Sequence, residues 1–285
     1  MSLPMTIAKR AGRTLLLLLF AAGGTILLVR FAPGFFSDFR EMDAKYAQAA
    51  QAEIQEENSQ QQSVGRIAMQ EGKSWLSGDF GQSRQYHVPV AQLIGSRVRV
   101  SALLLAQGIL CGWLLAICAA LPISALRKGA ALGRLPFTLL LAIPAAAMAT
   151  ACILADAGGP VLVLSLLIAA REFNFLRSLL EGAWRSPHLL QGRAQGMPPR
   201  ALVTLHILPN VAPQLCALTT LSLVTALGAL VPIEVIFTVP GVGQLAWSAV
   251  MNRDLPVLVA VSLLMACVVG FAGILSTRTV TLEAA

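Results

Sequence analysis

The chain has 285 residues, of which 56% are hydrophobic and 12% are charged, and its mean hydropathy is +0.72. A soluble domain carries about 25% charged residues, so this composition excludes an ordinary soluble enzyme and, being apolar, a disordered scaffold. The net charge is +7, but the basic residues lie between apolar runs, where they set membrane orientation, and we expect no nucleic-acid partner. The composition predicts an all-α polytopic membrane protein.

The first apolar run, Thr14 to Phe31, follows the basic residues Lys9, Arg10 and Arg13. A basic start and a leucine-rich run also describe a signal peptide, but no small-residue cleavage site follows. We therefore expect residues 1–31 to be an N-terminal tail and a retained first transmembrane helix.

Residues 32–99 form the one long polar stretch, which we expect to lie in the periplasm. Residues 41–62 are rich in Ala, Gln and Glu without Gly or Pro and predict a short helical outer segment. The segment Gly65 to Ser74 resembles a phosphate-binding loop ending in Gly-Lys-Ser. That motif needs four residues between its glycines, whereas six residues separate Gly65 from Gly72, so no ATP site is expected here.

Residues 100–285 predict a core domain with five further membrane helices. A helix needs about 20 apolar residues to cross the bilayer. The weakest run begins at Val161, because only ten apolar residues precede Arg171 and Glu172. It can cross only if the helix continues beyond these charges and they face protein. The other predicted spans are Val100–Leu121, Phe137–Ala155 (broken by Pro144), Val211–Val231 and Val257–Ser276.

Charge placement favours six spans with both termini in the cytoplasm. In that topology the inner segments hold twelve Lys or Arg and three acidic residues, whereas the segment 38–99 holds seven bases and eight acids. If the run after Val161 did not cross, five arginines between residues 171 and 200 would lie outside. The positive-inside rule disfavours that arrangement.

Signatures of catalysis, metal binding and cofactor binding are missing from the sequence. It has no GxSxG or HExxH pattern, only three histidines, and five cysteines that lie inside apolar runs without a CxxC pair. We therefore expect a protein that is not an enzyme. The strongly polar residues near the spans lie at or beyond the predicted span ends: Asp156, Arg171, Glu172, Glu234 and Asp254.

The loop 185–210 carries clear helix boundaries. Ser186-Pro187 predicts a helix start, Gly196 a left-handed stop, and Pro198-Pro199 a second helix that ends before Pro209-Asn210. Two short helices joined at Gly196 would form a compact cytoplasmic knob that docks a partner. The alternative is a plain basic loop between spans.

The segment between the last two spans contains bends at Pro240-Gly241 and Gly243. Irregular backbone at the membrane face needs protein or water to cover it. Glu234, near a span end, has two interpretations: a solvated interfacial carboxylate, or a pathway or helix-clamping group.

Three blocks resemble the inner-membrane permeases of bacterial binding-protein-dependent ABC importers, in particular the dipeptide, oligopeptide and nickel branch. The first block is Trp75 to Ser83 followed by Val88-Pro89-Val90. The second is Arg193 to Gly196 with His206 to Asn210. The third contains Glu234, Phe237, Pro240 to Gly243 and Arg253 to Pro256.

The resemblance implies a type I ABC importer permease fold and an inner-membrane subunit that moves peptides, nickel or related small solutes. Its partners would be a second permease subunit, two ATPase subunits that bind the ATP, a periplasmic or lipid-anchored substrate-binding protein, and membrane lipid. The ATPase-coupling residues would be Arg193, Ala194, Gly196, Arg200, His206 and Pro209. The outer gate and docking surface would comprise Asp79, Glu234, Pro240, Gly241, Gly243 and Asp254.

The chain departs from the family pattern at two places. Leu190, Gln191 and Gly192 stand where the family has Glu-Ala-Ala, and Arg99 and Ser101 stand where the branch has Pro and Thr. Two alternative functions stay open. An ion-gradient-driven carrier would be expected to show ionisable residues within its spans. A non-transporting scaffold or sensor is compatible with the altered Glu-Ala-Ala positions.

Overall fold

The structure is a computed structural model that describes residues 79–125, 134–184, 186, 191–192, 194–252 and 254–282, together with the helical positions 12, 16, 20, 23 and 24. Apart from those positions, the predicted first span lies outside the described residues, and so does the predicted outer helix 41–62. The chain divides into two compact units, residues 1–98 with 245–270 and residues 99–244 with 271–285, and each is described by itself.

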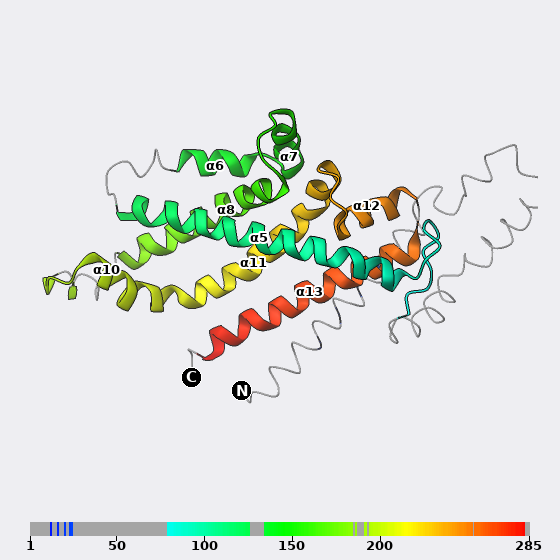
Figure 1. Ribbon diagram of the computed structural model, residues 1–285. Coiled ribbons are helices and arrows are strands. Elements are labelled where there is room, and N and C mark those ends of the chain that lie inside the picture. The colour runs from blue at the N-terminus through cyan, green and yellow to red at the C-terminus, as the bar shows by residue number, and fades with distance from the viewer. Residues whose placement is uncertain are drawn as a thin grey trace, which may run out of the picture. The chain divides into compact units, whose positions relative to one another are not determined.

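The described elements are helices, apart from one isolated antiparallel bridge between Gln82 and Pro89 (Figure 1). This agrees with the predicted all-α class. In chain order they are α5 (Val90–Ala125), α6 (Leu135–Ala142), α7 (Ala145–Leu154), α8 (Pro160–Trp184), α10 (Pro199–Leu202), the π-helix η1 (Val203–Ile207), α11 (Leu208–Ile236), α12 (Val242–Met251) and α13 (Leu255–Leu282).

Three of the described helices are long and apolar enough to cross a membrane: α5 over Val90–Pro122, α11 over Gln214–Ile236 and α13 over Leu255–Gly273. Each contains one of the predicted spans. The pair α6 and α7 would make a fourth span if the two helices count as one bent unit. The described part of the chain thus holds three or four candidate spans.

The third predicted span is bent more sharply than a kinked helix. The axes of α6 and α7 differ by 102° across Ile143 and Pro144. Ile143 is extended, with φ −88° and ψ 121°, because the proline ring excludes helical backbone from the residue before it. The expectation of a single span over Phe137–Ala155 is therefore corrected to two short helices, which form either a broken span or a re-entrant loop.

The run after Val161 continues as an unbroken helix to Trp184 (Figure 1). Its apolar residues Leu164, Ile168 and Phe173 are fully buried, so neighbouring helices surround it. Arg171 and Glu172 lie at the centre of this 25-residue helix, which corrects the expectation that they lie at a span end. The sequence-based boundary failed because a charge pair inside a helix ends an apolar run without ending the helix.

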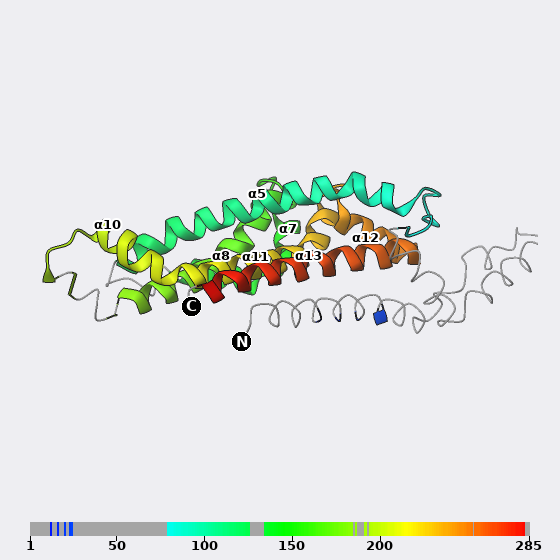
Figure 2. The same cartoon turned by 90° about the horizontal axis from the view of Figure 1, so that it is seen from below.

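Two glycines one turn apart bring α5 into close contact with α8. A Cβ atom at Gly108 would lie 2.5 Å from Leu164 Cδ2, and one at Gly112 would lie 2.9 Å from the backbone oxygen of Ser165. Gly-x-x-x-Gly spacing lets membrane helices approach closely, where dispersion contacts replace the hydrophobic drive that lipid removes. The contact fixes α5 along α8 (Figure 2).

We predict that Gly112→Ala destabilises the protein by about 1–3 kcal/mol, because the added methyl group meets rigid backbone and must force the helices apart. Gly95→Ala is the matched control, since it lies on the same helix with open space around it. The control should be neutral or stabilising by up to about 1 kcal/mol. Thermal unfolding of the purified protein compares the two, and equal midpoints would contradict the packing role.

Candidate functional site

The carboxylate of Glu234 is enclosed at the junction between α11 and α12. Glu234 is 0% exposed. Its Oε1 accepts a hydrogen bond from Ser101 Oγ at 2.6 Å, and its Oε2 accepts from the backbone N–H groups of Gly243 at 2.7 Å and Gln244 at 3.1 Å. The side chain thus caps the first turn of α12, whose N–H groups have no partner within the helix. Its negative charge also complements the positive end of the helix dipole.

Ser101 completes this arrangement from α5. Its hydroxyl donates to Glu234 and accepts the backbone N–H of Val242 at 2.7 Å. A residue on the second predicted span, one near the end of the fifth and the start of α12 are therefore joined through one hydroxyl. The family pattern has Thr at this position, and Ser keeps the hydroxyl that the bonds require.

Gly241 and Gly243 are required by the same carboxylate. A Cβ atom at Gly241 would overlap the Glu234 carboxyl group, and one at Gly243 would lie 2.9 Å from Val231 Cα and 3.0 Å from Glu234 Oε2. Glycine at both positions lets the backbone approach the acid closely enough to donate to it. We call Ser101, Glu234, Gly241, Val242 and Gly243 the α12 clamp.

The α12 clamp decides between the two interpretations of Glu234. A solvated interfacial carboxylate would be exposed, whereas this one is fully buried and hydrogen-bonded. The predicted outer-face residues Glu234, Gly241 and Gly243 come together here, and Pro240 is exposed in the adjoining turn. Ser101 was noted in the sequence only as a departure from the family. The signal that could have identified it is that Ser101 stands where the family has Thr, which also carries a hydroxyl group.

The other two predicted outer residues, Asp79 and Asp254, belong to the compact unit formed by residues 1–98 and 245–270. Asp254 is 0% exposed and accepts hydrogen bonds from Ser83 Oγ and from the backbone N–H of Gln85 at 3.2 Å. Asp79 is exposed and accepts the N–H of Gly81 at 3.0 Å. Asp254 therefore anchors the loop that precedes α5, while Asp79 shapes the start of that loop.

The predicted elbow at Gly196 has the expected left-handed backbone, with φ +76°. The N–H of Met197 bonds to the carbonyl of Gly192 at 3.2 Å, the pattern of a Schellman helix end. A Cβ atom at Gly196 would meet nothing within 4 Å, so the backbone angle alone favours glycine. Ala194 and Gly196 are both exposed.

The sequence predicted that the second helix of the loop ends before Pro209. In the structure it continues through Pro209 into α11. α10, η1 and α11 follow one another directly, and Pro209 is an exposed residue in the first turn of α11. The π-helix explains this difference: the N–H of Leu208 bonds to Val203 five residues back, which shifts the register just before the proline that lacks an N–H.

The remaining coupling residues are placed as follows. His206 is half-buried in the last turn of η1. Arg200 lies on α10, and Arg193 lies outside the described residues. Pro209 and Glu234 occupy the first and last turns of α11, about 38 Å apart along the helix axis. One continuous helix therefore connects the loop at residues 194–208 with the α12 clamp.

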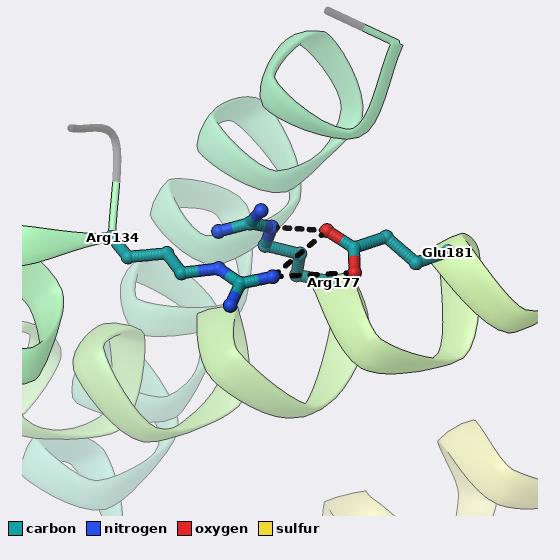
Figure 3. A network of polar contacts seen from close by, with 3 residues as sticks. All are labelled: Arg134, Arg177 and Glu181. Atoms are coloured by element: carbon teal, nitrogen blue, oxygen red, sulfur yellow. Dashed lines mark hydrogen bonds and ion pairs between the residues drawn. The ribbon is translucent and has the colours of Figure 1, made fainter. Parts of the chain in front are cut away.

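Near the C-terminal end of α8, Glu181 binds two arginines (Figure 3). Arg177 Nε donates to it at 2.7 Å and Arg134 Nη2 at 3.2 Å. Partial burial acts to raise the pKa of Glu181, but the hydrogen bonds and charges of Arg177 and Arg134 outweigh it and lower the pKa. We call Arg134, Arg177 and Glu181 the α8 ion cluster. Because Arg134 immediately precedes α6, this cluster links α6 to α8.

A match to a known protein family covers residues 108–282, more than half of the chain. The family is described as the binding-protein-dependent transport system inner membrane component. The chain belongs to this family. This confirms the predicted family and its location as a multi-pass component of the inner membrane.

Individual relatives agree with the branch that the sequence resembles. A putative peptide permease protein of Brucella suis is 28% identical over 232 residues, which cover 69% of this chain and 72% of the relative. The metal-staphylopine import system permease protein CntB of Staphylococcus aureus is 33% identical over 107 residues, 38% of this chain and 34% of the relative. A probable peptide ABC transporter permease protein of Sinorhizobium fredii is 27% identical over 106 residues. The chain thus spans about a third of the staphylococcal relative that it matches.

We predict that Ser101→Ala destabilises the protein by about 1–3 kcal/mol, because it leaves the buried N–H of Val242 and one oxygen of Glu234 without a partner. Ser96→Ala is the matched control on the same helix, since Ser96 is exposed and bonds only to the carbonyl of Leu93. It should change stability by less than about 0.5 kcal/mol. If thermal unfolding showed no difference between the variants, the clamp would not hold α12.

We predict that the α8 ion cluster of Arg134, Arg177 and Glu181 makes the stability of the protein fall at acidic pH. A lowered pKa in the folded state contributes stability above the ordinary value of 4.5 and loses it as pH falls through the folded value. The unfolding midpoint of Glu181→Gln should therefore lie below that of the unmodified protein at neutral pH and approach it below pH 4.5. Arg134→Gln should give part of the effect. Parallel pH profiles for all three proteins would refute this.

Proposed function

We propose that the chain is a permease subunit of an ATP-driven ABC importer that moves peptides, metal chelates or related small solutes into the cell. The observation that carries this proposal is the family match over residues 108–282. The names of the relatives support the solute classes, since they include peptide permeases and a metal-staphylopine permease.

The proposed topology has six spans with both termini in the cytoplasm. Two features support it. Glu172 and Arg177 of α8 are buried, so these two charges face protein rather than lipid and permit the helix to cross. The positive-inside rule then keeps the arginines after residue 171 on the inner side.

The proposed partners are a second permease subunit, two ATPase subunits and an external substrate-binding protein. The loop at residues 185–210 would contact the ATPase through Arg193, Ala194, Gly196 and Arg200, with His206 and Pro209 setting the loop against α11. Asp79 and Pro240, each within its own compact unit, would face the external side on which the binding protein docks, while the buried Asp254 would act only by holding the loop before α5.

Motion would pass along α11 as a rigid element. ATP-driven closure of the ATPases displaces the elbow at Gly196, and α11 carries that displacement to the α12 clamp at its other end. The clamp is suited to this role because its hydrogen bonds fix α12 to α11 and α5 without a flexible linker. A rigid-body transition of this kind switches between two packings rather than deforming continuously.

The Gly196 elbow provides the test in the complex isolated from native membranes with its partners. Gly196→Val should abolish substrate-stimulated ATP hydrolysis or assembly, because a β-branched residue strongly disfavours φ near +76°. Gly196→Asn is the matched control, since Asn tolerates left-handed backbone, and it should keep most of the stimulation.

Two results would contradict the proposal. If no ATPase co-isolates with the chain, an ion-driven carrier or a membrane scaffold is favoured instead. If the ATPase co-isolates but Gly196→Val stimulates as well as Gly196→Asn, the importer stands and the coupling role of the elbow falls.

A further inference from the structure

A chain of hydrogen bonds joins α5, α8 and α11 in the interior of the compact unit formed by residues 99–244 and 271–285. Trp113 Nε1 donates to Ser222 Oγ at 3.0 Å, and Ser222 Oγ donates to Glu172 Oε1 at 2.8 Å. Glu172 is 0% exposed, and its second oxygen, Oε2, is buried with no hydrogen-bond partner among the described residues. One carboxylate oxygen is thus held in place while the other is left unused.

The unused oxygen belongs to a residue midway along its helix. Glu172 is the central residue of α8, about 18 Å along the axis from either end. Ser222 is likewise central in α11, 14 residues from both Leu208 and Ile236. Water that reaches the ends of these helices therefore does not solvate the carboxyl group, and the cost of burying it is not relieved by solvent.

Arg171, the residue before Glu172 on α8, supplies the opposite charge. Its Nη1 bonds to Thr225 Oγ1, and Thr225 lies three residues beyond Ser222 on the same face of α11. That bond uses one of the five N–H donors of the guanidinium group. A guanidinium and a carboxylate oxygen are thus presented side by side along α11, about one helical turn apart.

In a purely structural ion pair, the two charged side chains would be expected to bond directly to each other. Here the two charged groups bond to different hydroxyls of α11 rather than to each other. Buried ionisable groups within membrane spans are costly and mark solute or ion pathways. A buried group that lacks a partner calls for one that arrives in another state of the protein.

We propose that Arg171 and Glu172 form a station on the translocation pathway for a zwitterionic solute. Its cationic amine would bind Glu172 Oε2 and its carboxylate would bind the guanidinium of Arg171, both as charge-assisted hydrogen bonds. Free amine and carboxylate groups are the features that peptides and amino-acid-derived chelators share. This inference rests on the proposed function, because it requires a pathway that opens during transport.

The experiment places a reporter thiol beside the charges and leaves the charges in place. Ser222→Cys is made in a background that lacks the five native cysteines, within the complex co-isolated with its ATPase. The rates of modification by a cationic and an anionic methanethiosulfonate reagent are measured without nucleotide, with ATP trapped, and during turnover. Thr225→Cys, one turn further on, is the second reporter.

In at least one of these states we expect the reporter to react, because the station then faces water. Glu172→Gln should lower the ratio of cationic to anionic rate on the order of tenfold, and Arg171→Gln should raise it by a similar factor, since each removes one charge from the local field. Glu181→Gln is the control with an acidic residue near the C-terminal end of α8, and it should leave the ratio unchanged.

Either of two results overturns the inference. Reporters at both positions that stay unreactive in every state would make the Arg171–Glu172 cluster a sealed structural element. Reactive reporters whose charge preference ignores both substitutions would place the pathway elsewhere. The importer function is tested separately, by co-isolation of the ATPase and by the Gly196 variants. A result that contradicts the station at Arg171 and Glu172 therefore leaves the importer proposal intact, and the two failures can be told apart.

Discussion

Polar groups that this chain carries into lipid must find their partners within the protein, because the bilayer interior offers none. The α12 clamp meets this constraint most completely. Glu234 is buried, yet it accepts three hydrogen bonds, and the same bonds supply partners to N–H groups at the start of α12. Without this carboxylate, the hydroxyl of Ser101 and the N–H groups of Gly243 and Gln244 would lose their acceptor. The constraint therefore explains the two glycines beside the carboxylate and the hydroxyl at Ser101.

The same constraint distinguishes the other buried acids. Asp254 organises the loop before α5 through Ser83 and Gln85, although its Oδ1 is buried without a partner among the described residues. Glu172 uses only one of its oxygens. Glu234, by contrast, uses both. An acid with an unused oxygen can gain a hydrogen bond if the protein changes state, whereas the fully bonded clamp fixes the first turn of α12 to α11.

The sequence predicted the family, the helical class, the elbow at Gly196 and the presence of a special carboxylate at Glu234. These signals are local: a left-handed stop, apolar runs and a Pro-Gly bend. It predicted a break at Pro144 but not the 102° angle between the two helices. It also did not predict that the helix continues through Pro209 or that Glu172 lies at the centre of α8. The position of Glu172 depends on residues distant in the chain, because protein packed around α8 buries its carboxyl group. The path through Pro209 depends on the π-helix η1, which shifts the hydrogen-bond register just before the proline. The grouping of Ser101 with Glu234, 133 residues apart, is beyond any local pattern.

The central claim is that force reaches this membrane component from a separate ATPase at its inner elbow. Ala194 is exposed beside Gly196 and tests this directly as a single reactive cysteine, Ala194→Cys, in native membrane vesicles of known orientation. We predict that a short bifunctional reagent joins it to the ATPase subunit and that a membrane-impermeant thiol reagent applied from the cell exterior leaves it unlabelled. Labelling from the exterior, or the absence of any cross-linked partner, would contradict the claim.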